Sequence, residues 1–249
     1  MELIYNWQAA LATVSAIIFI VTAGQFIVFR IPTIARARQA DKERNKEKWK
    51  QQSNKYRLRV PTSQKIGLAL NLLFYVAMLP FLATLEPQPL ANVALDVLLI
   101  LMVYDFFYYL VHRFIFHGQG YFRKVHAIHH QARSRVSSID SFLLHPAEIF
   151  VGIALFYTVT AILCFMSGGP FHVATLVITS VIYTQLNQIN HCRVDLNGFP
   201  WNTINWIAMK HDAHHQNMHK GNFATITLLF DKLFGTLEIH PLEKSAKEI

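Results

Sequence analysis

Five long apolar stretches follow one another along the chain, separated by polar or proline-containing links. A helix needs about 20 mostly apolar residues to cross the hydrocarbon core of a bilayer. The stretches that approach this length cover residues 7–29, 66–85, 90–111, 147–166 and 171–190. The last is the weakest, because threonine, glutamine and asparagine side chains interrupt it. The pattern predicts an all-α, multi-pass transmembrane helical bundle of about four to five spans.

Two of the links are short and rich in helix-breaking residues. Pro87 and Pro89 separate the second and third stretches, and Ser-Gly-Gly-Pro at residues 167–170 separates the fourth and fifth. Such residues are typical of tight turns, so each pair of stretches is expected to form a helical hairpin. Residues 1–6 lack the basic segment of a cleaved signal peptide, so we expect the first stretch to be retained as a span.

Composition supports a membrane location. Hydrophobic residues make up 53% of the 249 residues and charged residues only 15%, whereas soluble domains carry about 25% charged residues. The two cysteines, Cys164 and Cys192, form neither a disulfide framework nor a paired metal motif, and both are expected to be free thiols.

The basic residues are unevenly placed. Residues 30–65 contain twelve lysines and arginines, residues 113–135 contain five, and the chain after His191 contains six, which accounts for all 23. Basic residues concentrate on the cytoplasmic side of membrane proteins. Five spans with an outer N-terminus would place every one of them there. The basic segment 36–59 is expected to be a solvated connector on that face, or a surface that docks anionic lipid headgroups or an acidic electron donor.

Thirteen histidines occur in the chain, and most fall into short clusters with the spacing H-x4-H or H-x2-H-H. Residues three and four apart share one face of a helix, so H-x2-H-H can direct three imidazoles to one point or to two nearby points. Neutral imidazole suits Fe, Zn, Cu and Ni, whereas Mg and Ca prefer oxygen ligands. The candidate metal ligands are His112, His117, His126, His129, His130, His145, His191, His211, His214 and His215.

The pair His112 and His117 requires a local irregularity, because residues five apart lie about 140° apart on an ideal helix. We therefore expect a helix end or a bulge before Gly118. The predicted orientation puts all ten candidate ligands near the cytoplasmic face, where they would form a histidine-rich metal-binding cap. Three other histidines are expected not to bind metal: His172, His219 and His240.

The residues around these histidines resemble the fatty acid hydroxylase/sterol desaturase superfamily over about residues 98–237. The resemblance rests on DFFYYLVHR at 105–113, FRKVHAIHH at 122–130, LHPAE at 144–148, NH at 190–191, HDAHH at 211–215, GNF at 221–223 and DKLFGT at 231–236. It implies a non-haem di-iron oxidoreductase that uses O2 and external electrons to hydroxylate or desaturate a lipid, such as a fatty acyl chain or a sterol.

The resemblance also implies the cofactors and partners. Two Fe ions would be held by the ten histidines, with zinc as the alternative metal in isolated protein. The chain has no haem, flavin or ferredoxin motif, so electrons would come from a separate donor, either a cytochrome b5-like protein or a ferredoxin with its reductase. A lipid substrate and membrane lipids are the other expected partners, and no nucleic acid is expected.

Four polar residues near the histidines, namely Asp105, Glu148, Asp212 and Asn222, are expected to orient the imidazoles by hydrogen bonding, as carboxylates near metal sites commonly do. Asp105 lies seven residues before His112, on the same helix face, and a carboxylate inside a span needs a partner. For Asp212 a capping or surface position between the ligands is favoured over an orienting role. Residues 104–109 form an aromatic group, which is expected to pack or to line a substrate tunnel.

The sequence leaves several alternatives. The chain contains no H-E-x-x-H string, which argues against a metalloprotease. A membrane metal-binding or metal-transport protein without oxidase activity remains the alternative. Ligand type alone does not separate iron from zinc, and no motif separates hydroxylation from desaturation, although the short chain favours hydroxylation. We expect N-terminal helices and a connector at 1–97, a catalytic domain at 98–240 and a tail at 241–249, in a bacterial plasma membrane or the endoplasmic reticulum.

Overall fold

A computed structural model of the chain describes residues 4–133, 135–193, 198–199 and 201–241. All but the first residue of the expected C-terminal tail therefore lies outside the described residues. The elements are α1 (Trp7–Val28), α2 (Pro32–Gln51), α3 (Asn54–Ala77), α4 (Leu79–Leu82), β1 (Ala83–Thr84), α5 (Leu90–Leu110), η1 (Val111–Phe116), α6 (Tyr121–His126), η2 (His129–Gln131), η3 (Ser138–Phe142), α7 (Pro146–Met166), β2 (Phe171–His172), α8 (Val173–Asn190), α9 (Trp201–Gln216) and α10 (Leu229–Leu233).

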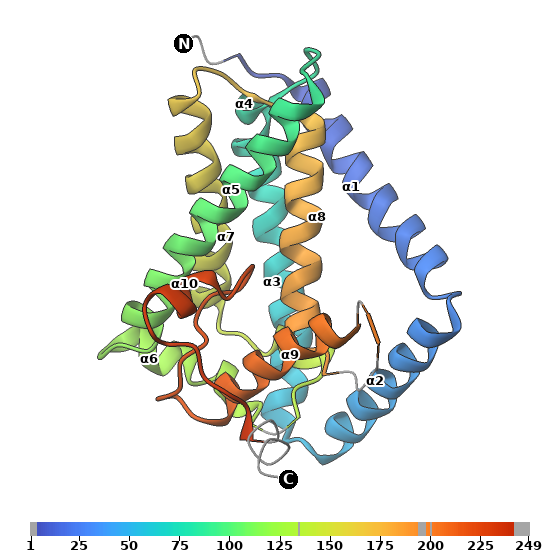
Figure 1. The fold of residues 1–249 in the computed structure, drawn as a ribbon, viewed down its shortest axis with the longest axis vertical. Helices are drawn as coiled ribbons and strands as arrows, with labels where there is room; N and C mark the ends of the chain where they lie inside the picture. The colour runs from blue at the N-terminus through green and yellow to red at the C-terminus, as the bar shows by residue number, and fades with distance from the viewer. Residues whose placement is uncertain (1–3, 134, 194–197, 200, 242–249) are drawn as a thin grey trace.

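The all-α membrane fold is confirmed. Among the described residues, three helices are long and apolar enough to cross a bilayer: Trp7–Val28, Leu90–Phe116 and Pro146–Met166. Of the other two apolar stretches, residues 66–85 run from the second half of α3 through α4 to β1, and residues 171–190 form β2 and α8, which carries the predicted polar side chains. Both run through the bundle beside the apolar helices (Figure 1). The total of four to five spans stays a prediction.

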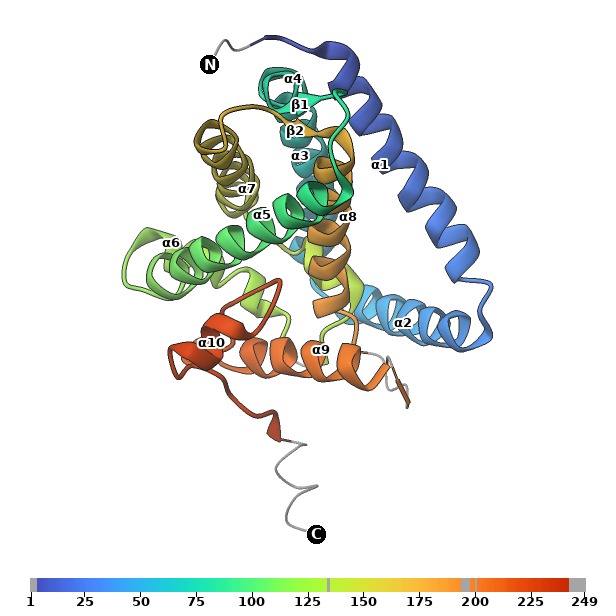
Figure 2. The same ribbon diagram turned by 45° about the horizontal axis from the view of Figure 1, so that its top comes forward.

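The long helices pack into one apolar core. Ile100 and Tyr104 of α5, Phe156 and Tyr157 of α7, and Leu176 of α8 belong to a single buried cluster. In both ribbon views α1 lies on the outer side of α8, and α6, α9 and α10 gather at the end of the bundle away from α4 (Figures 1 and 2). At the opposite end, β1 and β2 pair in parallel and tie together the two predicted hairpin links.

The basic connector is a largely exposed surface helix, α2, continued by the start of α3, and a few side chains attach it to the rest of the bundle. Asp41 of α2 accepts a hydrogen bond from the backbone N–H of Ser138, and Lys48 forms an ion pair with Asp140. The hydroxyl of Tyr56 donates to the same Asp140 carboxylate at 2.9 Å. Asp140 is fully buried, so these contacts satisfy a carboxylate that would otherwise be costly to bury. The connector thereby braces η3, which lies between two histidine clusters in the sequence.

Candidate metal centre

Five histidines from four elements and one loop position form the first cluster. Their donor atoms all lie within 4.8 Å of one another. Four Nε2 atoms make a closed ring, with separations of 3.0 Å for His112 to His126, 3.1 Å for His126 to His130, 3.1 Å for His130 to His214 and 3.2 Å for His214 to His112. The fifth, the Nε2 of His117, is buried without a hydrogen-bond partner among the described residues.

Four more histidines form the second cluster, from η2, the end of α8 and α9. Their Nε2 atoms are separated by 3.2 Å for His129 to His191, 3.1 Å for His191 to His211 and 3.1 Å for His211 to His215. All four residues but the half-buried His211 are buried. The structure thus brings nine of the ten predicted ligands into two groups that could each hold a metal ion.

In these rings Nε2 is the inner nitrogen, which faces the cluster, and Nδ1 is the outer nitrogen, which faces away from it. The partner of Nδ1 shows which of the two nitrogens carries the proton. In six of the nine rings Nδ1 faces an oxygen that only accepts hydrogen bonds, so Nδ1 must be the donor and Nε2 keeps its lone pair. Inward-facing lone pairs about 3 Å apart repel one another unless a cation lies between them. The six acceptors are Phe223 O for His112 at 2.6 Å, Met218 O for His117 at 2.7 Å, Glu148 Oε1 for His126 at 2.7 Å, Leu143 O for His129 at 3.3 Å, Asn187 O for His191 at 2.8 Å and Gly221 O for His214 at 2.8 Å.

Distances and protonation both fit a transition metal. Two nitrogens bound at about 2.1 Å and at right angles around one ion are about 3.0 Å apart, close to the 3.0–3.2 Å of the first ring. Burial lowers the pKa of His117 to about 4 and that of His214 to about 3. These rings are therefore neutral at pH 7, as metal ligation requires. The all-imidazole donor set suits Fe or Zn better than Mg or Ca.

The irregularity predicted between His112 and His117 is a π-helix, η1. The backbone N–H of His117 donates to the carbonyl of His112 at 2.9 Å, the i to i+5 bond that defines this helix. The two imidazole centroids are consequently only 5.0 Å apart. Gly118 follows because a Cβ there would lie 2.0 Å from the carbonyl oxygen of Phe114.

Consecutive histidines separate into different clusters. His130 belongs to the first and its neighbour His129 to the second, and the same holds for His214 and His215. Adjacent residues on a helix point about 100° apart, so one backbone segment can serve two sites. The rings of His130 and His215 stack across the boundary, with centroids 4.8 Å apart. The two clusters therefore share one packed wall.

The remaining histidines have other contacts. His145 lies in neither cluster, and its Nδ1 accepts a hydrogen bond from the backbone N–H of Ala147 at 3.1 Å as the N-cap of α7. His172 caps α8 in the same way. His240 is buried with its Nε2 2.9 Å from Asp212 Oδ2, and His219 is exposed.

Of the four polar residues expected near the ligands, Glu148 is the one with a contact to a clustered imidazole, that of His126. Asp105 instead accepts hydrogen bonds from the backbone N–H groups of residues 225, 226 and 227 and from the hydroxyl of Thr227. It thus anchors the loop whose Phe223 carbonyl receives the Nδ1–H of His112.

Asn222 and Asp212 hold the backbone around α9. Asn222 adopts φ +66 and donates to the carbonyl of Lys210 at 2.9 Å. Asp212 accepts from the backbone N–H of Val136 at 2.9 Å and pairs with Arg193.

Asp231, which sequence reasoning did not select, is fully buried and accepts from the N–H groups of residues 223 and 224 at 2.8 Å. Its place in the DKLFGT motif was the only sequence signal for it.

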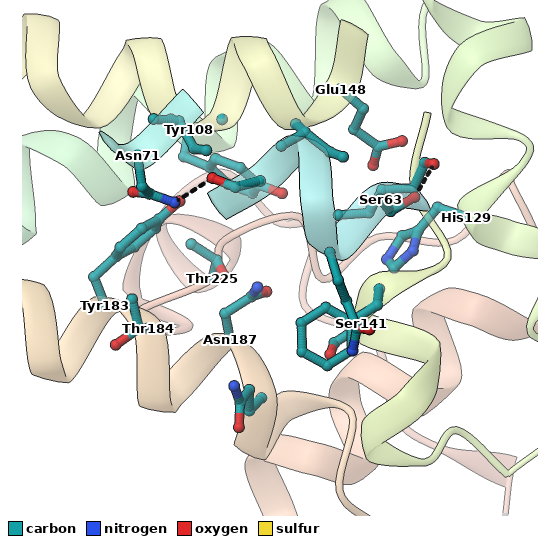
Figure 3. Close-up of a pocket in the computed structure, with 18 of the residues that line it drawn as sticks. Ser63, Asn71, Tyr108, His129, Ser141, Glu148, Tyr183, Thr184, Asn187 and Thr225 are labelled. Atoms are coloured by element: carbon teal, nitrogen blue, oxygen red, sulfur yellow. Dashed lines mark hydrogen bonds between the residues drawn. The ribbon is translucent and has the colours of Figure 1, made fainter. Parts of the chain in front are cut away.

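A pocket of about 290 Å³ adjoins the second cluster, between α3, α5, α7 and α8. His129 and Glu148 lie at one end of it, and Asn71 and Tyr183 lie at the other (Figure 3). Tyr108 also lines it, in agreement with the expected tunnel-lining position for part of the aromatic group. Its position lets a molecule held among the long helices approach the histidines.

Comparison with known proteins identifies relatives that act on lipids. The chain is 29% identical over 164 residues to methylsterol monooxygenase 2-2 of Arabidopsis thaliana, a match that covers 63% of this chain and 58% of the relative. It is 30% identical over 154 residues to cholesterol 25-hydroxylase-like protein 2 of Danio rerio, covering 59% and 51%. Very-long-chain aldehyde decarbonylase GL1-10 of Oryza sativa subsp. japonica is 28% identical over 166 residues, covering 60% and 49%.

These matches span about half to three-fifths of the relatives' lengths. No solved structure matches the chain significantly. The family model for fatty acid hydroxylase matches residues 97–236, more than half of the chain, and this stretch contains every histidine of both clusters. The chain therefore belongs to the fatty acid hydroxylase family.

Proposed function

We propose that this protein is a membrane-bound non-haem di-iron oxygenase that uses O2 and external electrons to hydroxylate a lipid, with desaturation as the alternative outcome. The observation that carries the proposal is the pair of converging all-histidine clusters beside a pocket within a membrane helix bundle. Each cluster would hold one iron ion. Such iron supplies the activation of O2 for attack on a C–H bond, which amino-acid side chains alone do not provide.

The residues of the chain prepare the centre for this chemistry. Glu148 and five backbone carbonyls hold the outer nitrogens, so the inner nitrogens keep their lone pairs pointed at each centre. His145 is left out of this nine-histidine set, because its Nδ1 caps α7. We assign the catalytic unit to residues 98–240.

The membrane setting supports a lipid substrate. The pocket lies among the long helices and ends at His129, so a lipid could keep its apolar body in the bundle while one carbon reaches the metal. The names of the relatives point to sterols and long-chain aldehydes as substrate classes of those proteins. Similarity at this level favours a sterol or another long-chain lipid here.

Electrons would arrive from the cytoplasmic side. A second cavity of about 450 Å³ reaches His130 and His215 and is bordered by Arg123 and Arg133. Such a basic rim attracts an acidic donor protein, as charge complementarity does in other transient complexes. This arrangement agrees with the orientation inferred from the basic residues, in either a bacterial plasma membrane or the endoplasmic reticulum.

The test combines lipid analysis with metal analysis. Cells that make the protein, the His129→Ala variant or no protein are compared by lipid mass spectrometry, and purified protein is assayed for iron. Wild type should produce an O2-dependent oxidised lipid that the variant does not. The matched control is His172→Ala, since His172 caps α8 at the opposite end of the bundle and belongs to neither cluster. Identical lipid profiles in all cells would refute the oxygenase proposal, and metal flux in liposomes would favour transport.

A further inference from the structure

The second half of α1 is largely exposed. The buried residues of this helix, Ala9, Ala10 and Thr13, all lie in its first half. Near its end, Phe26 and Ile27 are 62% and 63% exposed. In both ribbon views this end lies at the outer corner of the molecule, away from α6 and α10 (Figures 1 and 2). Because α1 is long and apolar enough to cross a bilayer, its second half would be surrounded by lipid.

Two arginine side chains lie over aromatic rings at this end of α1. The guanidinium carbon of Arg30 is 3.8 Å from the centroid of the Phe26 ring, and that of Arg38, which belongs to α2, is 3.9 Å from the centroid of the Phe29 ring. Phe26 and Phe29 are three residues apart, so they lie on the same side of the helix. The turn between α1 and α2 therefore directs two guanidinium groups to one side of the span where it ends.

Neither arginine is neutralised by an acidic side chain. Both are exposed, and in the described part of the chain no ion pair or hydrogen bond joins them to a carboxylate. Asp41, three residues after Arg38, is buried and accepts from the backbone N–H of Ser138. Glu43 lies five residues after Arg38, about 140° around the helix. Lys42, one turn after Arg38, is exposed and adds a third cation on that side.

The chemistry of this arginine pair fits a phosphate group. Guanidinium groups present planar sets of N–H donors that match phosphate oxygens, and two of them can hold one phosphate from two sides. Because both groups are stacked on rings, less conformational freedom is lost when an anion binds. They lie at the end of a lipid-exposed span, the depth of the phospholipid headgroups. The orientation predicted from the basic residues makes this the cytoplasmic face, where anionic lipids attract basic segments.

We propose that Arg30 and Arg38 bind the phosphate of an anionic phospholipid whose acyl chains lie along the second half of α1, with Lys42 next to its headgroup. An acidic protein fits this position less well, because lipid would cover the span that carries the two rings. The cavity beside the metal clusters is also bordered by α6, across the bundle from α2 (Figure 2). The bound lipid would join the end of α1 to α2, which in turn contacts η3 through Asp41.

The experiment counts the lipids that stay bound to the full-length protein in native mass spectrometry. The protein is released from detergent micelles that contain phosphatidylglycerol and phosphatidylcholine in equal amounts, and wild type should retain phosphatidylglycerol preferentially. Arg30→Gln and Arg38→Gln should each lower this preference about fivefold, the effect of one cation near an anionic surface. The double variant should lower it about 25-fold.

The matched control is the double variant Arg36→Gln/Lys50→Gln. It removes the same charge from the same helix, at exposed positions for which no ring contact is seen among the described residues. This variant should keep the preference for phosphatidylglycerol. Melting temperatures measured in phosphatidylcholine alone should match wild type for all variants, since the replaced side chains are exposed. The single arginine variants are compared separately, so the test does not depend on the double variant being stable.

Two soluble competitors separate a lipid from other anionic partners. Glycerol 3-phosphate represents a free phosphate, and a polyglutamate peptide represents an acidic protein. Neither should displace phosphatidylglycerol at about a hundredfold excess, because neither has acyl chains to lie along α1. Displacement by either one would overturn the assignment to a lipid. Equal losses in the control and in the arginine double variant would overturn the site itself, as would a wild type without preference for phosphatidylglycerol.

Discussion

Removing the carboxylate of Asp105 should destabilise the protein and release metal, although Asp105 touches no clustered histidine. Its two oxygens accept from the backbone N–H groups of Thr225 at 2.9 Å, Ile226 at 2.8 Å and Thr227 at 3.0 Å, and from the Thr227 hydroxyl at 2.7 Å. Asp105→Ala leaves three backbone donors without a partner. The loop they belong to carries the carbonyl that receives the Nδ1–H of His112.

The magnitude follows from the burial of each donor. The hydrogen bond of Ile226 is buried, and those of Thr225 and Thr227 are part-buried. An unsatisfied buried donor costs about 1–3 kcal/mol; with about 2 for Ile226 and about 1 for each of the others, Asp105→Ala loses about 4 kcal/mol. At about 2–4 °C per kcal/mol, the melting temperature should fall by about 8–16 °C. Asp105→Asn keeps one accepting oxygen and should lose about 1 kcal/mol.

A thiol-reactive dye can follow unfolding in detergent, because Cys164 is buried and Cys192 is half-buried in the folded protein. Asp96→Ala is the matched control, since this aspartate lies on the same helix and no hydrogen bond to it is seen among the described residues. Bound iron, measured on the same samples, should fall with Asp105→Ala and not with Asp96→Ala. A melting temperature for Asp105→Ala within 1–2 °C of wild type, with metal retained, would refute the reasoning.

Three further outcomes are expected. His191→Ala should lose bound metal, whereas His145→Ala should retain it and lose only about 1 kcal/mol of helix capping; equal metal loss in both would contradict the assignment of His145 as a cap. Burial lowers the pKa of His117 from 6.5 to about 4, so between these values the unfolded chain binds a proton that the folded chain does not. The stability of metal-free protein should therefore be highest above pH 6.5 and fall on acidification toward pH 4, which denaturant titrations at several pH values would detect. Gly221→Ala should displace its loop, because the new Cβ would lie 1.8 Å from the carbonyl oxygen of Thr236, and a normal melting temperature would show that the loop adapts.

Local spacing was enough to predict much of the metal centre. The H-x2-H-H spacing identified six of the clustered histidines, and the spacing of five between His112 and His117 required a helix end or a bulge, which is found as η1. Apolar stretches of bilayer length predicted the long helices, although α3 begins twelve residues before its apolar part. Each of these inferences depends on contacts within a few residues of chain.

The remaining features depend on contacts between distant residues, which spacing does not reveal. Asp105 meets the backbone of a loop 120 residues later, and Asp41 meets a serine 97 residues later. The acceptors for the outer nitrogens are mostly backbone carbonyls, whose direction is set by loop conformation and not by residue type. The distribution of consecutive histidines between two clusters likewise appears only when α9 and η2 are packed together.

The distribution of consecutive histidines between the two clusters should couple the binding of the first metal ion to that of the second. His129 and His130 share a peptide bond, yet they face different clusters, as do His214 and His215. If each cluster holds one ion, as proposed, the first ion to bind immobilises backbone that the second ion also needs. The second ion then loses less conformational entropy on binding, which is positive cooperativity without any change of shape. A titration with iron should accordingly be sigmoidal, and a half-loaded sample should be a mixture of empty and doubly loaded molecules.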